Sequence, residues 1–434
     1  MKARYISVAG LLIASTLLFG CGKEAAPETK EAAPETKEAV QQVEEVVEET
    51  PEETIEEEPE KVEEADPYQN TISDKTKEHA KSFPSIDEQY SAWRGTHVNN
   101  KFEYAWVAVE PYTSKMDEFV AANDDVDWSL VEASNKFDEA TFEAVSKAGY
   151  NFVRIPLDTR FFFTDDKYYN VESTGETWKG DIETYNVSNW QDLDKAIGWC
   201  IDRDMHVCID VHSTPGGFMI GGDEEESRQG LFSEEDSTYA DIFLEFWQQA
   251  AERYQDIDAK ALSFNLYNEP PTFMHERQDD YADLMCSAIE KIRSVSPERL
   301  VFVDALDYST CGLDSVEKFS GIDNLIFSFH YYSDFQWSTD EMLNGDWKSE
   351  CNKRIAGYND WAESNGVKWM LQEYGIQSDM HDLDTRLKFT QHVTECVAGY
   401  GVPYCHYGFA TGTPFNFYDG ENVISPELVE LTVK

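Results

Sequence analysis

Eight short apolar runs recur along the chain after residue 90, and amphipathic stretches separate them. The segments FDEATFEAVSKAG (137–149) and DIFLEFWQQAAERY (241–254), for example, carry apolar residues at helical spacing. Short, nearly continuous apolar strands that alternate with helices predict a parallel sheet that is covered on both faces. The runs lie at 91–98, 151–157, 205–212, 262–270, 300–306, 325–332, 369–375 and 403–410.

Eight strand–helix units in this length predict an α/β fold of the (β/α)8 TIM-barrel type. A doubly wound open sheet is the alternative, but no G-x-G-x-x-G motif follows the first strands. The longest connections follow the first three strands. In a barrel these connections lie at the C-terminal face, where active sites form.

The N-terminal residues follow a different pattern. Residues 1–21 combine a basic start with an apolar run from Ile6 to Phe19, which is short for a bilayer span. The run closes with LFGC, which resembles a bacterial lipobox. This resemblance implies a lipoprotein signal peptide over 1–21 and lipidation of Cys21. The alternative is an uncleaved signal anchor with an incidental cysteine.

Residues 22–66 have the composition of a tether. They contain two tandem copies of EAAPETK, no aromatic residue, and 18 acidic residues against four lysines. Such a segment repels itself and buries little, so we expect a disordered acidic linker that leads to a folded domain over 67–434. A lipid on Cys21 would anchor that domain to a membrane, and Gly22 favours the outer membrane or cell surface.

Charge and cysteine content exclude several classes of protein. The net charge of −50 argues against nucleic acid and anionic lipid surfaces as partners, and is typical of a very soluble exported protein. Seven cysteines follow Cys21, without any C-x-x-C pair, so a zinc ribbon or thioredoxin-type motif is not expected. Because seven is an odd number, at least one of these cysteines has no partner for an intramolecular disulfide. Separately, we expect the protein to be a monomer.

Polar residues gather where the predicted strands end. Side chains at the same end of successive barrel strands converge on one cavity, so these residues predict a single site. They are His97, Arg154, His212, Asn268, Glu269, His330, Tyr332, Glu373, His406 and Tyr407, from the first, second, third, fourth, sixth, seventh and eighth strands.

Two members of this set, Glu269 and Glu373, lie on strands four and seven and therefore on opposite sides of the barrel mouth. Glycoside hydrolysis requires such a pair. One carboxyl group must be protonated to donate to the leaving oxygen, and the other must be ionised. Either glutamate could alone be a structural, salt-bridged residue. Together, at matching strand ends, they favour catalysis.

The chain from about residue 90 to 419 resembles glycoside hydrolase family 5, the cellulase-type TIM-barrel enzymes. NLYNEP is similar to the Asn-Glu-Pro signature of the family, and LQEYG to its second glutamate signature. The resemblance implies that Glu269 is the acid/base and Glu373 the nucleophile of a retaining hydrolase. Further motifs imply substrate-site roles for five residues: Arg154 in VRIP, His212 in DVHS, Asn268 beside the acid/base, and His330 and Tyr332 in FHYY.

The eighth strand departs from the family pattern. The family has a tryptophan there as a stacking platform, whereas YCHYGFATG offers Tyr407, which has a smaller ring face. We expect Tyr407 and His97 to contribute to substrate binding. Four tryptophans near loop positions are candidates for outer platforms, with core packing as the alternative: Trp93, Trp106, Trp178 and Trp337.

Two other functions remain open. A metal-dependent hydrolase on the same barrel would use strand-end histidines, but the first strand reads THVN and lacks the His-x-His pair. A surface lipoprotein that binds glycan without cleaving it would fit the altered eighth strand. We expect no metal and no cofactor. The expected substrate is a β-1,4- or mixed-linkage glucan, with mannan, xyloglucan and β-1,3-glucan as alternatives.

Overall fold

The computed structural model describes residues 66, 68–98, 102, 137–162, 187–215, 231–233, 237–332, 346–410 and 414–434. The predicted signal peptide with Cys21 and nearly all of the predicted tether lie outside the described residues. So do Trp106, Trp178 and Trp337. No helix in the described part of the chain is both long and apolar enough to cross a membrane.

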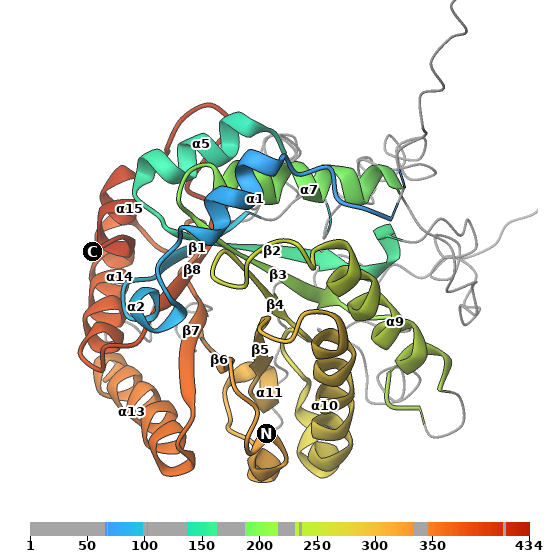
Figure 1. Ribbon diagram of the computed structural model, residues 1–434. Helices are drawn as coiled ribbons and strands as arrows, with labels where there is room; N and C mark the ends of the chain where they lie inside the picture. The colour runs from blue at the N-terminus through green and yellow to red at the C-terminus, as the bar shows by residue number, and fades with distance from the viewer. Residues whose placement is uncertain are drawn as a thin grey trace, which may run out of the picture. The chain divides into compact units, whose positions relative to one another are not determined.

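Eight parallel strands close into a barrel in the order β1 to β8, and helices surround them (Figure 1). The predicted TIM barrel is therefore confirmed, and each predicted run overlaps one strand. The strands are β1 (Arg94–Val98), β2 (Phe152–Asp158), β3 (His206–Ser213), β4 (Leu262–Asn265), β5 (Leu300–Asp304), β6 (Leu325–Tyr331), β7 (Lys368–Tyr374) and β8 (Tyr404–Ala410).

The largest difference from the prediction is the end of the fourth strand, which was expected at residue 270 and lies at Asn265. Beyond it the backbone amides of Leu266 and Asn268 still donate to carbonyls of the neighbouring strands, at 3.1 and 3.0 Å. Glu269 then adopts a left-handed backbone with φ of 50°, which ends the extended conformation before Pro270.

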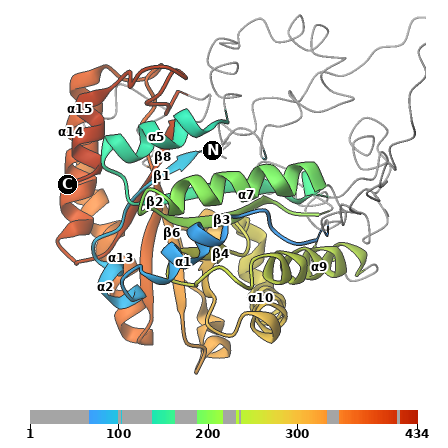
Figure 2. The same cartoon turned by 45° about the horizontal axis from the view of Figure 1, so that its top comes forward.

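The helices follow the strands around the outside of the barrel, as Figure 2 shows from a second direction. Each predicted helical segment contains a helix. The α-helices are α1 (Asp74–Lys81), α2 (Ile86–Tyr90), α5 (Glu139–Ala148), α7 (Val187–Ile201), α9 (Thr238–Arg253), α10 (Gln278–Val295), α11 (Leu306–Ser309), α13 (Trp347–Asn365), α14 (Leu383–Ala398) and α15 (Pro426–Thr432). Short 3-10 helices are η4 (Thr159–Phe162), η5 (Thr272–Arg277) and η6 (Asp314–Phe319).

Local sequence determines where these helices begin and end. Asp138 caps α5 by accepting a hydrogen bond from the amide of Thr141, and Gly149 ends it with φ of 100°. The buried residues Phe142 and Val145 form the face of α5 that packs against the core. Both the cap and the apolar face are visible in the sequence, which is why this helix could be predicted.

The barrel interior changes from apolar to polar along the strands. At the N-terminal end, alternate strand residues form an apolar cluster: Trp93, Phe152, Cys208, Leu300, Phe302, Ile326, Met370 and Cys405. Trp93 is 1% exposed, so it closes this end of the core and is not the outer platform that was considered. Two residues further along β2, β3 and β5, the same inward positions carry Arg154, Asp210 and Asp304. The apolar layer supports a charged layer above it.

Candidate active site

Glu373, on β7, lies in the middle of the charged layer with both carboxylate oxygens bound. Its Oε1 accepts a hydrogen bond from Arg154 Nη1, and its Oε2 accepts one from the Tyr332 hydroxyl at 2.9 Å. Burial raises the pKa of Glu373, while the adjacent Arg154 and the Tyr332 hydrogen bond act against the rise. Burial and the charge of Glu373 keep Tyr332 protonated, because both raise its pKa.

Glu269 faces this group from the loop after β4. Its Oε1 lies 2.8 Å from Nδ1 of His330, which pairs with Glu373 in the register of β6 and β7. Burial raises the pKa of Glu269 well above its usual range, and the charges of Glu373 and Asp304 add to the rise. The pKa of His330 is lowered by burial and by Arg154, so His330 stays neutral and does not offset this effect. Glu269 therefore takes up a proton more readily than a solvated glutamate does.

Arg154 connects Glu373 to Asp210 and to the side-chain amide of Asn268. Its Nη2 donates to Asn268 Oδ1 at 2.7 Å and lies 2.9 Å from Asp210 Oδ1. Asp210 Oδ2 lies 2.8 Å from Nδ1 of His212, whose Nε2 is 3.4 Å from the Asn268 amide nitrogen. Burial raises the pKa of Asp210 to about 7, against the effect of Arg154. These contacts fix the direction of the Asn268 and His212 side chains.

Asp304, at the end of β5, holds the backbone that presents Glu269. Its Oδ2 accepts hydrogen bonds from the backbone amide of Glu269 at 3.0 Å and from the Ser309 hydroxyl at 2.7 Å, and Oδ1 accepts one from Asn265. Oδ2 also lies 3.6 Å from Nε2 of His330. This fully buried carboxylate therefore fixes the backbone of Glu269 and lies beside His330, whose Nε2 is 3.3 Å from the Ser328 hydroxyl.

Sequence reasoning missed Asp210, Asp304 and Asn265. A signal was present, because each interrupts an apolar strand at an inward position: CID, FVD and SFN. A buried strand has no reason to carry a carboxylate or amide unless a partner compensates its burial. Searching the strand interiors as well as the strand ends would have found them.

Tyr407 belongs to an aromatic group beside Tyr332. Its ring centroid lies 5.0 Å from that of His97, 5.6 Å from that of Phe415 and 6.4 Å from that of Tyr332. Tyr407 is 8% exposed. His97 lies beneath it, fully buried, with Nε2 3.1 Å from the carbonyl oxygen of Gln372. Gly408 follows with φ of 122°, and a Cβ there would lie 2.4 Å from the Phe415 carbonyl, so only glycine allows this close approach.

Among the ten strand-end residues named from the sequence, the structure brings together all except one. His406 was expected at the common cavity, but it points to the opposite face of β8. Its ring stacks on Phe417 at 4.2 Å and packs edge-on against Tyr374 at 5.3 Å. Neighbouring residues of a strand point to opposite faces of the sheet. Cys405, which precedes His406, faces the barrel interior, so His406 faces outward. Phe415, which no sequence signal had indicated, lies in the site instead.

One group among the described residues offers ligand atoms at metal-binding distances: Glu269, His330 and Glu373, within 4.8 Å of one another. Arg154 contacts Glu373 in the same layer, and its pKa is raised because Asp210, Glu373 and Asp304 outweigh its burial. A permanent positive charge in contact with one ligand opposes a cation there. The donor set therefore fits a metal poorly.

The sequence that forms this barrel matches the model of a known protein family. The model of the cellulase family, glycosyl hydrolase family 5, matches residues 117–409. The chain belongs to glycosyl hydrolase family 5. This is a family of O-glycosyl hydrolases, and the matched residues span the barrel from before β2 to the end of β8.

Similar curated proteins include two types of glucan hydrolase. Endoglucanase C of Acetivibrio thermocellus is 24% identical over 45% of this chain and 50% of its own length. Endoglucanase 3 of Fibrobacter succinogenes is 23% identical, over 62% and 46%. The probable glucan 1,3-beta-glucosidase A of Neosartorya fischeri is 26% identical, over 50% and 49%. The chain thus spans about half the length of the curated relatives it matches.

Solved structures share the fold. A glycoside hydrolase crystal structure aligns with a TM-score of 0.56 at 22% identity, covering 68% of this chain and 92% of that one. A hyperthermophilic endo-beta-1,4-glucanase solved with substrate aligns with a TM-score of 0.52 at 22% identity, over 68% and 89%. At these identities the likeness supports the barrel and leaves the substrate open.

Proposed function

We propose that this protein hydrolyses β-glycosidic bonds with retention of configuration, with Glu269 as acid/base and Glu373 as nucleophile. The observation that carries the proposal is the spacing of the two side chains, since an oxygen of each lies within 4.8 Å of the other. Retaining enzymes hold their carboxyl groups about 5–5.5 Å apart, whereas inverting enzymes need about 6.5–9.5 Å to admit a water molecule. The close pair supports retention.

In the first step Glu373 attacks the anomeric carbon while Glu269 donates its proton to the glycosidic oxygen. The C–O bond to the leaving sugar breaks, and a glycosyl ester on Glu373 forms. The local charges support this division of roles. Glu269, with the more strongly raised pKa, holds the proton, and Arg154 and Tyr332 stabilise the ionised form of Glu373.

In the second step a water molecule attacks the anomeric carbon and Glu269, now ionised, takes its proton. The ester bond to Glu373 breaks and the free enzyme returns. Asn268 lies beside Glu269 with its amide held by Arg154, in a position to hydrogen-bond a sugar hydroxyl. Tyr407, His97, His212, His330 and Tyr332 complete the walls and the supports of the innermost subsite.

The proposed substrate is a β-1,4- or mixed-linkage glucan, because endoglucanases are among the relatives matched. A β-1,3-glucan is the second candidate, since relatives named as probable glucan 1,3-beta-glucosidases match a similar share of the chain. A panel of carboxymethyl cellulose, barley β-glucan, laminarin, mannan and xyloglucan separates them. We expect release of oligosaccharides from the first two. Glucose alone from laminarin would replace this assignment with an exo-acting β-1,3-glucosidase, and no release from any glycan would favour the non-catalytic binder.

The network around Asp304 predicts a pH effect. The Asp304 charge helps to raise the pKa of Glu269, after burial and Glu373. Replacing Asp304 by Asn removes that charge, so the proton of Glu269 becomes easier to lose. We expect the alkaline limb of the kcat/KM–pH profile to move to lower pH, and kcat/KM at the optimum to fall roughly tenfold or more as the hydrogen bonds change.

Asp314, an exposed residue of η6, is the matched control. Asp314→Asn should leave the whole profile in place. If Asp304→Asn lowers kcat/KM at the optimum but does not move the alkaline limb, Asp304 supports the fold without acting on the pKa of Glu269.

We also propose attachment to the outer membrane or cell surface through a lipid on Cys21, on the strength of the sequence pattern alone. A tether of about 45 residues would let the barrel reach polymeric substrate. Cys21→Ser should move the protein from the membrane fraction to the soluble fraction. A membrane fraction that still holds the variant would exclude the lipid anchor.

A further inference from the structure

Cys351 and Cys396 come from neighbouring helices and have no role in the proposed chemistry. Cys351 lies in the second turn of α13 and is fully buried, while Cys396 lies in the last turn of α14 and is partly buried. Both are free thiols. The two helices follow consecutive barrel strands and lie along the same side of the molecule (Figure 1).

The contacts between these helices place the two cysteines in register. The Trp347 ring lies 6.0 Å from that of Phe389 and 5.2 Å from that of His392, and His392 Nε2 lies 3.3 Å from the carbonyl oxygen of Lys348. The helices run in the same direction, because both lead back to the start of a parallel strand. One turn beyond Lys348 is Cys351, and one turn beyond His392 is Cys396.

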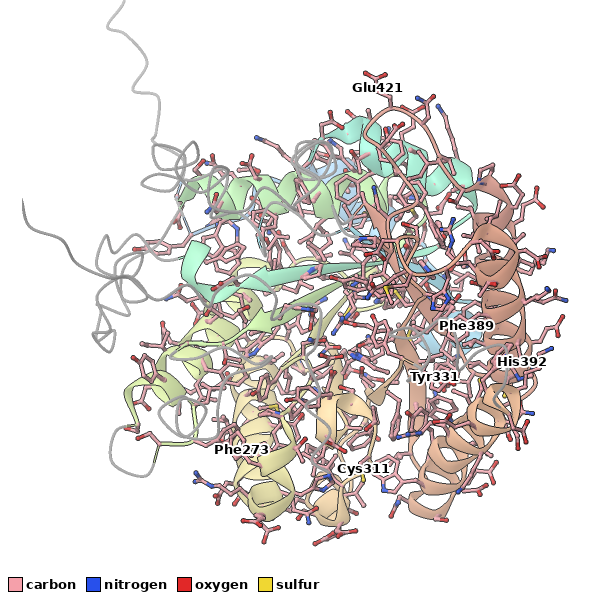
Figure 3. All side chains as sticks on the ribbon, turned by 180° about the vertical axis from the view of Figure 1, so that it is seen from behind. Phe273, Cys311, Tyr331, Phe389, His392 and Glu421 are labelled. Carbon is pink, nitrogen blue, oxygen red and sulfur yellow. The ribbon has the colours of Figure 1, made fainter. Side chains whose placement is uncertain are left out.

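This register sets the two cysteines on facing turns. The interaction with Cys351 lowers the pKa of Cys396 below its usual value. The ring of Tyr331, the last residue of β6, stacks on that of Phe389 with centroids 6.1 Å apart. Figure 3 shows Tyr331, Phe389 and His392 close together at this side of the barrel.

We propose that Cys351 and Cys396 form a disulfide bond when the protein meets an oxidising thiol–disulfide couple. The side chains leave from facing turns of two packed helices, which the Trp347–His392 and Lys348–His392 contacts hold in register, and this is the approach that a disulfide needs. The proposal does not depend on the proposed hydrolase activity. It agrees with export, which the N-terminal sequence predicts, since disulfides persist outside the cytosol.

The chemistry balances with a small disulfide as oxidant. The thiolate of Cys396, the more accessible partner, attacks one sulfur of oxidised glutathione and releases one glutathione thiolate. The thiol of Cys351 then loses its proton and displaces the second glutathione. Two protein thiols are oxidised to one disulfide, and one oxidised glutathione is reduced to two thiols.

The disulfide would stabilise the part of the barrel that carries Glu373. The 351–396 loop that it closes includes β7, and the stacking of Tyr331 on Phe389 connects α14 to the end of β6, where His330 lies. Closing a loop of this length restricts the unfolded chain strongly. We expect the oxidised protein to melt higher than the reduced protein by on the order of 5 °C.

Peptide mapping of the full-length protein tests the proposal without any variant. The protein is incubated with oxidised glutathione, its remaining thiols are alkylated, and its peptides are analysed by mass spectrometry without reduction. We expect one crosslinked pair that contains Cys351 and Cys396, and its loss after reduction. Alkylation of both cysteines after this treatment, a mixed disulfide that stays on Cys396, or a bond from either to another cysteine would overturn the proposal.

Single variants add a second readout. Cys351→Ser and Cys396→Ser should each lose the difference in melting temperature between oxidised and reduced samples. Cys286→Ser, at another half-buried helical cysteine, should keep it. A difference that survives in both of the first two variants would show that another bond is responsible.

Discussion

Replacing Glu373 by Ala is expected to lower kcat on β-glucan by roughly 10⁴- to 10⁶-fold, because the nucleophile and the groups that activate it act as a unit. Arg154 and Tyr332 then hold no carboxylate against the anomeric carbon. Azide added to the variant can occupy the emptied space and attack in place of the glutamate. With an activated aryl glycoside it should give a glycosyl azide of inverted, α configuration.

Glu276 gives the matched control for this variant, since it is an exposed glutamate in η5, close in sequence to Glu269. Glu276→Ala should retain the activity of the unchanged protein. Substantial activity of Glu373→Ala on β-glucan, or an azide product of retained configuration, would contradict the nucleophile assignment.

Replacing Glu269 by Ala is expected to lower kcat on β-glucan by about 10²- to 10⁴-fold, since proton transfer to the leaving oxygen is lost. A dinitrophenyl glycoside needs no such proton, because its leaving group is already stable as an anion. This substrate should therefore give a rapid burst of dinitrophenolate followed by slow turnover. The second step still lacks its general base.

Azide distinguishes this residue from Glu373. In Glu269→Ala it should accelerate turnover of the glycosyl-enzyme and give a product of retained, β configuration. Equal loss of activity on dinitrophenyl glycoside and on β-glucan, without a burst, would place the acid/base elsewhere.

The barrel could be predicted from the sequence because its strands are buried on both faces and read as apolar runs between helices. The ends of the strands were harder to predict from the sequence. The run at 262–270 carries buried residues as far as Pro270, but Glu269 has a left-handed backbone, and its amide is held by Asp304. Such a conformation depends on a residue 35 positions away, which no local pattern contains.

The site residues that belong to catalytic motifs could be predicted from the sequence, whereas those whose position depends on side-chain packing could not. Glu269 and Glu373 stand in short polar signatures at strand ends. His406 and Tyr407 are neighbours on β8, so only one of them can face the barrel interior, and the register shift of β8 against β1 after His406 keeps the sequence from showing which. Phe415 reaches the site from a segment after β8, so its place depends on the closed barrel.

Trapping the intermediate tests the central claim most directly. A 2-deoxy-2-fluoro glucoside or cellobioside with a dinitrophenyl leaving group slows the release of the sugar more than its attachment, so a retaining enzyme accumulates the glycosyl ester. After peptic digestion, we expect one added sugar mass on the peptide that contains Glu373, and none on the peptide with Glu269. An adduct on Glu269, or steady turnover that yields the inverted α sugar with no adduct, would contradict it.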